Sequence, residues 1–452
     1  MQRSVARDRA AKATPRTHGG GTLSAWRVAW HEFRDAVSYF SRPARLYLGA
    51  EFLLWTGHGI FSVLFNLYLV EAGAGEAFVG RAVAANGIGM VIAALPAGWL
   101  ADRWGRRRTL MLGAVLDGFG HLLRATLPAG PLLLGASFLT GVGQSLFQIA
   151  AIPFLSDHST PRERTHLFSM FFASALLAGV FGNAIGGLLP ELARAAVPGL
   201  SWFVAYRAAL IVGAFAAAAA ALPLLALRGL VEPRHALESP PPTAHESRRL
   251  IPIALNAALI GAGAGFVIPF MNLYFKDRFA CTSTQIGSYF SVAQLFTAAA
   301  ALAAPALARR FGKLRTAVAA ELLSLPFLVT LGGERHLPIA VGAFWLRAMF
   351  MQASTPLLQA FVMEVLPPGL RARSSSLNNM LWNMGWAVSA TFAGTILERF
   401  GNAVPFYCTA VLYLIAAVTF YLAFRGTPEP NTHAVGLSEE AKGRRGEGAN
   451  TD

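Results

Sequence analysis

Three side chains that could carry out acid–base chemistry share one face of an apolar stretch, residues 109–127. Asp117, His121 and Arg124 are separated by four and three residues, the spacing that places side chains on one side of a helix. An acid, an imidazole and a guanidinium inside an apolar segment are typical of a proton relay or an anion site, because isolated charges are costly there. A structural ion-pair network between neighbouring helices is the alternative.

A polar stripe runs along an earlier apolar stretch, residues 46–70. Its members recur at steps of 4, 3, 4 and 4 residues and are Glu51, Trp55, His58, Ser62 and Asn66. Such a stripe would be costly against lipid, so we expect it to face a polar interior between helices. With the first group, the candidates for proton coupling are Glu51, His58, Asp117, His121 and Arg124.

The composition is that of an integral membrane protein. Of 452 residues, 54% are hydrophobic and 14% are charged, against about 25% charged in soluble proteins. The net charge of +14 does not indicate nucleic-acid binding, because the basic residues cluster between apolar stretches and no nucleic-acid-binding motif is present. Cys281 and Cys408 lie far apart without metal-ligand spacing, so we expect neither a disulfide framework nor a metal site. The basic N-terminus lacks the apolar core of a signal peptide, and none is expected.

Twelve apolar stretches are each long enough to cross a hydrocarbon core of about 30 Å. They lie near residues 46–70, 77–100, 109–127, 131–155, 167–190, 203–227, 250–275, 284–308, 315–333, 337–364, 375–397 and 404–424. The sequence therefore predicts an all-α integral membrane protein with twelve transmembrane helices. Outside them we expect a tail (1–45), a polar linker (229–249) and a disordered tail (426–452). The first tail should contain an amphipathic helix on the membrane surface, and packing of this helix against the protein itself is the alternative.

Basic residues between the stretches set the orientation. If both termini are cytoplasmic, 29 of the 38 Lys and Arg residues lie on the cytoplasmic side and five on the other. Membrane proteins keep such an excess on the cytoplasmic side. We therefore expect a multi-pass protein of the bacterial cytoplasmic (inner) membrane, with both termini in the cytoplasm and the lipid bilayer as its partner.

The two halves of the chain repeat in the same orientation. Related residues recur 207 positions apart: Gly105 and Gly312, Arg106 and Lys313, Asp157 and Glu364, Pro161 and Pro368, Arg164 and Arg371, and Gly187 and Gly394. Asn66-Leu67-Tyr68 recurs as Asn272-Leu273-Tyr274 at an offset of 206. Two parallel six-helix repeats, here residues 46–228 and 250–425, are a plan that transporters use, with the substrate site between them.

A short basic turn, residues 98–108, separates the second and third stretches. It reads Gly-Trp-Leu-Ala-Asp-Arg-Trp-Gly-Arg-Arg-Arg, and its charges require a loop on one membrane face. The turn resembles the loop between helices two and three of the major facilitator superfamily, G-x-L-x-D-R-x-G-R-R/K-x-R/K, at every fixed position but the last, where Thr109 occurs. With the internal repeat, the resemblance covers residues 44–425.

The resemblance implies a cytoplasmic gate. In the family the loop aspartate lies at the start of helix eleven and also pairs with the arginine four residues on. That arginine engages an acid at the end of helix four. The matching positions are Asp102, Arg106 and Asp157, whose contacts should hold the outward-open state. In the second repeat Arg309 replaces the aspartate, so we expect a weaker gating contact there. The predicted gating residues are Gly98, Asp102, Arg103, Gly105, Arg106, Asp157, Gly312, Lys313 and Glu364.

Two local expectations accompany the gate. Gly98 is expected to let backbones approach closely, and Gly105 to allow a sharp reversal. Helix eleven is expected to open with Ser374, Ser375 and Ser376, which are suited to cap it.

The resemblance also implies that helices one, four, seven and ten line a central cavity. The candidates for substrate contact are His58, Asn66, Gln144, Gln148, Asn256, Asn272, Gln294, Arg347, Gln352, Asn379, Asn383 and Trp386. For each, an interhelical hydrogen bond is an equally good interpretation. Residues 182–187, Gly-Asn-Ala-Ile-Gly-Gly, resemble the G-P-x-x-G-G motif of drug/proton antiporters with Asn183 in place of proline; close helix packing is the other interpretation.

These features favour a secondary active transporter that works by alternating access. Proton-coupled efflux of organic molecules is favoured over uptake of a small polar or anionic solute, for which Arg347 is the main support. Lipid handling and a non-transporting membrane sensor are further alternatives. No G-x-x-x-x-G-K-[ST] or H-E-x-x-H sequence is present, so we expect neither nucleotide use nor an enzyme. We expect no cofactor besides a proton or ion gradient, no nucleic-acid partner and a monomer.

Overall fold

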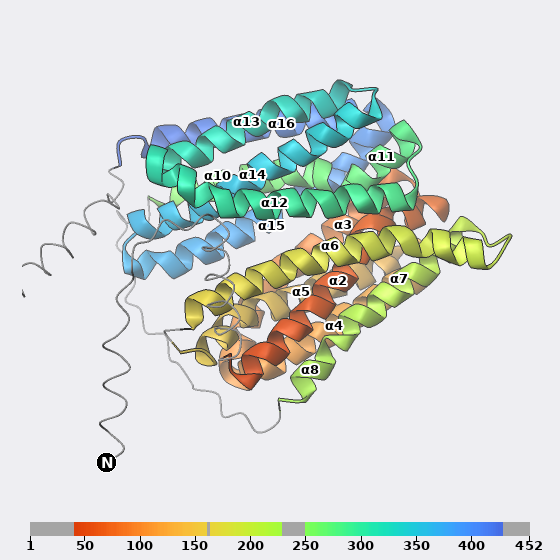
Figure 1. Cartoon of the computed structure of the whole chain (residues 1–452), viewed down its shortest axis with the longest axis horizontal. Coiled ribbons are helices and arrows are strands. Elements are labelled where there is room, and N and C mark those ends of the chain that lie inside the picture. Colours follow the sequence, from red (N-terminus) through yellow and green to blue (C-terminus); the bar gives the residue numbers. More distant parts are fainter. Residues whose placement is uncertain (1–39, 161–162, 228–248, 428–452) are drawn as a thin grey trace, which may run out of the picture.

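The computed structural model describes residues 40–160, 163–227 and 249–427 (Figure 1). Within these ranges all regular secondary structure is helical. The predicted surface helix in residues 1–45, the linker 229–249 and the tail 426–452 lie outside the described residues, except for a few positions at their edges.

The described residues form twelve long helical segments at the predicted positions. The first half contains α2 (Arg42–Glu71), α3 (Glu76–Trp104), α4 (Arg106–Thr126), α5 (Pro131–Asp157), α6 (Arg164–Ala196) and α7 (Trp202–Ala219), which continues into α8 (Ala221–Leu225). The second half contains α10 (Leu250–Val267), continued by η2 (Ile268–Phe270) and α11 (Met271–Phe279), then α12 (Ser283–Phe311), α13 (Lys313–Gly333), α14 (Leu337–Val365), α15 (Pro368–Phe400) and α16 (Ala403–Phe424). Pro269 lacks a backbone N–H, which accounts for the short 3₁₀ turn between α10 and α11.

Nine segments in the described part of the chain are long and apolar enough to cross a membrane. The other three long segments are α4, α14 and α15. Asp117, His121 and Arg124 lie in α4, and Arg347 lies in α14.

Helix α15 begins at Pro368 and not at residue 375 as predicted. Proline fits the first helical turn, because its missing N–H would have no partner there and its φ is already helical. The N-cap residue is Pro367, and no side chain caps the helix. The prediction that Ser374 and the two serines after it cap this helix is therefore wrong, since they lie beyond its first turn.

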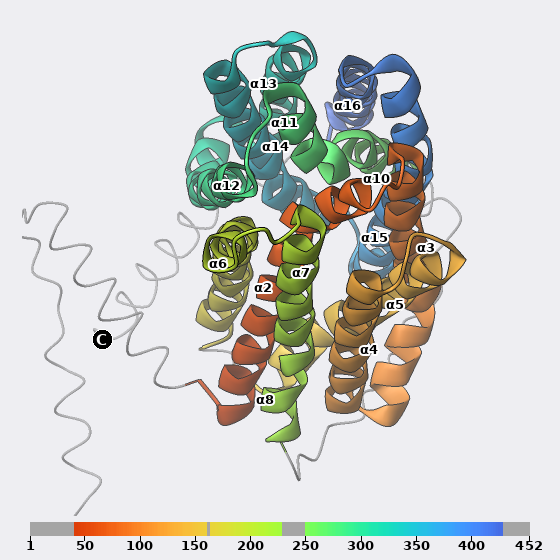
Figure 2. The same ribbon diagram turned by 90° about the vertical axis from the view of Figure 1, so that its right-hand side faces the viewer.

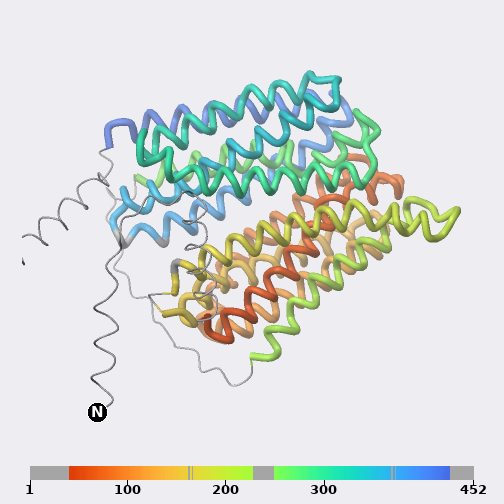
Figure 3. The backbone as a smooth tube through the Cα atoms, in the orientation of Figure 1, coloured from red at the N-terminus to blue at the C-terminus, as the bar shows by residue number. Residues whose placement is uncertain are grey.

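Each half folds into a bundle of six helical segments (Figures 1 and 3). The bundles meet along two crossings, α3 with α15 and α6 with α12. Figure 2 shows both crossings from the end where the bundles are close together. We call this the far end. The opposite end, which carries residues 103–108 and 309–315, is called the basic end, and there the bundles diverge.

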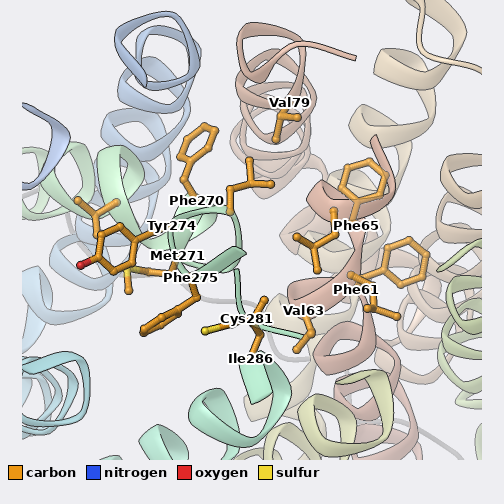
Figure 4. Close-up of a cluster of buried hydrophobic side chains, with 14 of the residues drawn as sticks. Phe61, Val63, Phe65, Val79, Phe270, Met271, Tyr274, Phe275, Cys281 and Ile286 are labelled. Carbon is orange, nitrogen blue, oxygen red and sulfur yellow. The ribbon is translucent and has the colours of Figure 1, made fainter. Parts of the chain in front are cut away.

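The buried apolar side chains show the same difference between the ends. At the far end one cluster includes residues of both bundles, such as Phe61 and Phe65 from α2 and Phe270, Tyr274 and Phe275 from the second half (Figure 4). Toward the basic end the clusters are separate. One lies within the first bundle, and two lie within the second. The shared far-end core therefore joins the bundles, while each basic-end core stabilises one bundle alone.

The turns at the basic end need glycine. Gly105 between α3 and α4 has φ of 96°, and Gly312 between α12 and α13 has φ of 87°. Side chains other than glycine are strained in this region. The expected sharp reversal at Gly105 is confirmed, and its repeat equivalent uses the same backbone conformation.

Candidate functional site

A buried acid lies between two imidazoles inside the first bundle. Asp117 of α4 has no exposed surface, and its two carboxylate oxygens lie 3.4 Å from His58 Nε2 on α2 and 3.4 Å from His121 Nδ1 on its own helix. The two imidazole rings are 4.7 Å apart. The predicted stripe on α2 and the predicted face on α4 therefore meet in one cluster, which we call the His–Asp cluster (His58, Asp117, His121 and Arg124).

The ring nitrogens of this cluster have restricted proton positions. His58 Nδ1 is 3.1 Å from the carbonyl oxygen of Leu54, and His121 Nδ1 is 2.9 Å from that of Asp117. A carbonyl only accepts, so each Nδ1 donates its hydrogen to its own helix. In a neutral His58 the Nε2 lone pair would then face the Asp117 carboxylate. One added proton between Nε2 and the carboxylate converts this repulsion into a hydrogen bond.

Arg124 balances the charge of Asp117. Its guanidinium is largely buried, with the carbon 3.8 Å from the ring centre of Phe65 and 5.3 Å from that of Phe61. It acts on Asp117 electrostatically. A buried carboxylate and guanidinium together are close to neutral, which is the condition under which ionised groups are tolerated in a membrane protein.

The same atoms could coordinate a metal ion by geometry alone. Ligand atoms of His58, Asp117 and His121 lie within 4.8 Å of one another. Together with Asp117 and Arg124, a divalent ion would give the buried site a net charge of about +2, at a large desolvation cost. The charges therefore favour a proton over a metal, and the expected absence of a metal stays a prediction.

His58 connects the cluster to its surroundings. Its side chain is 16% exposed, whereas those of Asp117 and His121 are at most 1% exposed. The fifth coupling candidate, Glu51, is buried two turns earlier on α2, beside Tyr47. The structure therefore brings four of the five predicted coupling residues together and leaves Glu51 apart.

Two equivalent ion pairs lie at the basic end. Arg106 pairs with Asp157 and also donates to the carbonyl oxygen of Pro153 at 2.8 Å. In the second bundle Lys313 pairs with Glu364. Each pair joins the helix after the glycine turn to the end of the fourth helix of its repeat. The predicted contact between the loop arginine and this acid is therefore present in the first bundle, and a lysine makes the equivalent contact in the second.

The predicted contact of Asp102 with the start of helix eleven is absent in this structure. Asp102 is exposed and forms no hydrogen bond or ion pair with any described residue. Arg103 stacks its guanidinium carbon 5.1 Å from the ring centre of Trp99 on its own helix. A Cβ at Gly98 would meet no described atom within 4 Å, so the expected close backbone approach is also absent. The separation of the bundles at the basic end accounts for both differences.

Two predicted cavity residues join the bundles at the far end. Asn66 Nδ2 donates to Asn272 Oδ1 at 3.2 Å, and Asn272 Nδ2 donates to the carbonyl oxygen of Val63 at 2.9 Å. Both asparagines are buried. They are equivalent positions of the repeat, and each bonds to the opposite bundle.

Three further candidates form hydrogen bonds inside the second bundle. Asn256 donates to the carbonyl oxygen of Ala416 at 3.4 Å, and Asn383 donates to that of Asn379 at 2.8 Å. Arg347 Nη2 donates to Tyr413 Oη at 3.0 Å, and the residue is only 5% exposed. The Asn256 and Arg347 contacts join different helices and match the interhelical interpretation, whereas the Asn383 bond lies within α15. The contact with Tyr413 weakens the case for Arg347 as an anion ligand.

The remaining candidates are more accessible. Gln352 and Asn379 are exposed, Gln144, Gln148 and Gln294 are partly buried, and Trp386 stacks on Trp382 with ring centres 5.1 Å apart. They come from helices of both bundles, α5 in the first and α12, α14 and α15 in the second. Their role as substrate contacts stays a prediction.

The glycine-rich segment of α6 packs against two helices. A Cβ at Gly186 would lie 2.8 Å from the Cα of Ile60 on α2, and one at Gly187 would lie 2.5 Å from the carbonyl oxygen of Ser283 on α12. Asn183 Oδ1 accepts from Ser62 Oγ at 2.8 Å. Close helix packing therefore accounts for this segment.

Sequence reasoning missed a buried acid in the second bundle. Glu321 of α13 is 1% exposed and accepts a hydrogen bond from Ser354 Oγ at 3.3 Å. Its position inside a predicted span was the signal that could have found it. A hollow of about 440 Å³ at the far end, lined by Tyr68, Glu71, Phe203 and Arg207 among others, includes none of the predicted candidates.

Comparisons with known proteins agree with this architecture. The family model described as Major Facilitator Superfamily matches residues 47–255 and again residues 253–447. The chain is 29% identical over 158 residues to a Na(+), Li(+), K(+)/H(+) antiporter of Planococcus maritimus, covering 34% of this chain and 37% of that protein. It is 29% identical over 282 residues to the enterobactin exporter EntS of Shigella flexneri, covering 60% of this chain and 62% of that protein. The match thus spans less than two thirds of the length of either relative.

The fold is also that of solved transporters. A bacterial homologue of the human lysosomal transporter Spinster, in an inward-facing and unoccupied conformation, superposes with a TM-score of 0.69. The alignment covers 85% of this chain and 96% of that chain, at 15% sequence identity. At this identity the likeness concerns the fold alone.

Proposed function

This chain belongs to the major facilitator superfamily, and we propose that it is a secondary transporter that exports a small organic solute by alternating access, driven by protons. The observation that carries the proposal is the difference between its two ends. One apolar core joins the bundles at the far end, while separate cores stabilise each bundle at the basic end. Such a molecule is suited to rock about a central site, opening one end as the other closes.

We place the basic end in the cytoplasm. The excess of basic residues on the side of both termini supports this orientation in a bacterial cytoplasmic membrane. The structure then corresponds to the state open to the cytoplasm, in which Asp102 is exposed and its contact with α15 is broken. The bilayer is the partner that this function needs, and a single chain contains both bundles, so a monomer suffices.

Proton coupling is assigned to the His–Asp cluster. His58 Nε2 lies 3.4 Å from the Asp117 carboxylate. The hydrogen of a neutral His58 is on Nδ1, where it is donated to the Leu54 carbonyl oxygen, so no hydrogen lies between Nε2 and the carboxylate. The pair therefore has room for one proton and a reason to bind it. His58 is partly exposed and provides the path for the proton. Arg124 neutralises the charge of Asp117 when no proton is bound.

Survival of an efflux-deficient bacterial host on a broad panel of toxic compounds tests this function. Cells producing the protein are compared with cells producing equal amounts of Asp102→Asn, which keeps the size of the side chain and removes its charge. Asp102→Glu keeps the charge and is the matched control. We expect full protection by the normal protein and by Asp102→Glu, and weaker protection by Asp102→Asn.

The alternatives give different results in the same experiment. Greater sensitivity of cells producing the protein would indicate uptake. Unchanged survival on every compound, with the protein present in the membrane, would contradict export of toxic organic molecules. Protection that is equal for the normal protein and Asp102→Asn would support export and remove Asp102 from the cycle.

A further inference from the structure

The two helix crossings at the far end are equivalent parts of the repeat. In one crossing, α6 meets the start of α12; in the other, α15 meets the start of α3. Equivalent residues at an offset of 207 are Gly187 and Gly394, Gly80 and Gly287, Ala77 and Thr284, and Glu191 and Glu398. A Cβ on any of these four glycines would collide with backbone of the opposite bundle, so the backbones are in direct contact at both crossings.

At the first crossing, Glu191 of α6 reaches the start of α12. Its Oε1 accepts from the backbone N–H of Thr284 at 3.1 Å and from the hydroxyl of Ser283 at 3.4 Å. Thr284 Oγ1 in turn donates to the carbonyl oxygen of Gly187 at 3.2 Å. A carboxylate of the first bundle therefore satisfies a first-turn donor of a helix in the second bundle.

At the second crossing, Glu398 of α15 reaches the start of α3 in the same way. Its Oε1 accepts from the backbone N–H of Ala77 at 2.8 Å. Helix α3 begins at Glu76 and has Gly75 as its N-cap residue, which offers no side-chain cap. A carboxylate of the second bundle therefore satisfies a first-turn donor of a helix in the first bundle.

A helix start is a favourable place for a carboxylate. The first N–H groups have no partner within the helix, and the helix dipole favours negative charge there. When the carboxylate comes from another bundle, this stabilisation exists only while the bundles touch. Opening the far end removes both carboxylates from their helices and returns the N–H groups to water.

We propose that Glu191 and Glu398 are a pair of inter-bundle helix caps that hold the far end closed and are released together when the protein opens outward. This assignment rests on the proposed alternating-access function. It supplies the far end with a counterpart to the basic-end contact expected of Asp102. Two caps therefore close the far end. In one, a glutamate of the first bundle caps a helix of the second bundle, and in the other a glutamate of the second bundle caps a helix of the first.

The two caps differ in their surroundings. Glu191 receives hydrogen bonds from a hydroxyl and an N–H, whereas Glu398 is exposed and receives the Ala77 N–H. Glu398 also lies within electrostatic reach of Glu76, which in turn interacts with Asp277. Like charges weaken a carboxylate cap, so we expect the Glu191 cap to contribute more to closure.

Cysteine labelling at the far end tests the proposal. Ser291 of α12 is buried at the crossing and donates to the carbonyl oxygen of Val180, so Ser291→Cys is the probe, in a protein carrying Cys281→Ser and Cys408→Ser. Labelling by a membrane-impermeant maleimide is measured in purified protein. We expect Glu191→Ala to label about fivefold faster and Glu191→Ala/Glu398→Ala faster than either single variant, because each removes a charge-assisted hydrogen bond.

Glu334→Ala is the matched control. Glu334 lies at the same end and accepts from the backbone N–H groups of His336 and Arg335 in its own bundle, which lowers the pKa of its carboxyl. Its removal deletes bonds of the same kind without touching the other bundle. We expect its labelling rate to equal that of the parent protein. Glu191→Gln and Glu398→Gln remove the charge with less change of shape and replace any alanine variant that fails to fold.

The outcomes separate the caps from transport itself. Labelling rates of all cap variants within about twofold of the Glu334→Ala control, in a protein that exports its substrate, would overturn the caps alone. Faster labelling of the cap variants in a protein that protects cells from no compound would keep the caps and contradict the proposed export. Faster labelling together with export supports both.

Discussion

The two bundles share a backbone plan but not their buried chemistry. At the far end they are nearly interchangeable, with glycines and a glutamate at equivalent positions of each crossing. Inside, the first bundle buries Asp117 between His58 and His121. The residues 207 positions after Asp117, His121 and Arg124 are Ser324, Leu328 and Leu331, which carry no charge. The repeat is thus symmetric where the protein closes and asymmetric where a proton is proposed to bind.

The second bundle has a different polar cluster. Glu321 accepts from Ser354, while Arg347 donates to Tyr413, and Tyr413 is within electrostatic reach of both charged residues. Glu321 and Tyr413 are each at most 1% exposed. No member of this cluster resembles the partly exposed His58, so we assign it to the structure of the bundle. Under the proposed function, the first bundle therefore supplies the proton site, and the second bundle has no equivalent of it among the described residues.

The largest expected difference between the bundles concerns their buried acids. Asp117→Asn should reduce proton-driven transport to the level of empty vesicles, because the asparagine N–H replaces the added proton permanently and cannot release it. Glu321→Gln should reduce it by less than about threefold, since the amide oxygen can still accept from Ser354. Transport of a compound identified by the survival panel, driven by an imposed pH gradient in vesicles, is the measurement.

Exchange of labelled for unlabelled compound without a pH gradient is the control for Asp117→Asn. This exchange needs rocking but no net proton movement, so it should continue. Loss of exchange as well as driven transport would show that Asp117 supports the bundle and not the coupling. Equal loss in Asp117→Asn and Glu321→Gln would break the comparison between the bundles.

The second difference concerns the ion pairs at the basic end. The side chains of Arg106 and Asp157 are 13% and 8% exposed, whereas those of Lys313 and Glu364 are 24% and 35% exposed. Asp157→Asn should therefore lower the free energy of unfolding by about 1–2 kcal/mol, and Glu364→Gln by about 0.5 kcal/mol or less. The apparent melting temperature of purified protein in detergent measures both. A larger loss of unfolding free energy for Glu364→Gln than for Asp157→Asn would show that the ion pair of the second bundle is the stronger one.

The sequence was sufficient for the parts of the fold that depend on local patterns. Apolar length placed all twelve helical segments, because each must cover the same hydrocarbon thickness. The offset of 207 predicted equivalent turns, and Gly105 and Gly312 have matching positive φ. The start of α15 was misplaced because the apolar pattern begins later than the helix, which starts at Pro368.

The site could be predicted only in part, because its contacts join helices distant in the sequence. Both Asp117 and His58 were identified as costly polar residues in apolar spans, but their pairing depends on how α2 packs on α4. Asn66 and Asn272 were assigned to a cavity, and their bond across the bundles depends on which end is closed. One sequence encodes every conformational state of such a protein. That the basic end is open and Asp102 is exposed in this state could therefore not be deduced from the sequence.

A third and smaller difference concerns the aspartate of the basic turns. Asp102 is expected to contact α15 when the basic end closes, whereas Arg309 occupies the equivalent region of the second bundle. Asp102→Asn should lower the population of the state that is open at the far end by roughly threefold, because one exposed charge at a helix start is lost. Arg309→Asp should raise that population by a similar factor. Labelling of the Ser291→Cys probe reports both, and equal rates in the two variants would contradict the asymmetry.

The smallest expected difference is between the two far-end crossings, because equivalent glycines fill equivalent roles. Gly80→Ala and Gly287→Ala each place a Cβ against a carbonyl oxygen of the opposite bundle, that of Ala390 and that of Asn183. Both should push the bundles apart and speed Ser291→Cys labelling to a similar degree, within about twofold of each other. Gly49→Ala is the control, since a Cβ there meets no described atom within 4 Å. If alanine speeds labelling at one crossing and not at the other, a single crossing holds the far end closed. The far end would then be no more symmetric than the buried interiors of the two bundles.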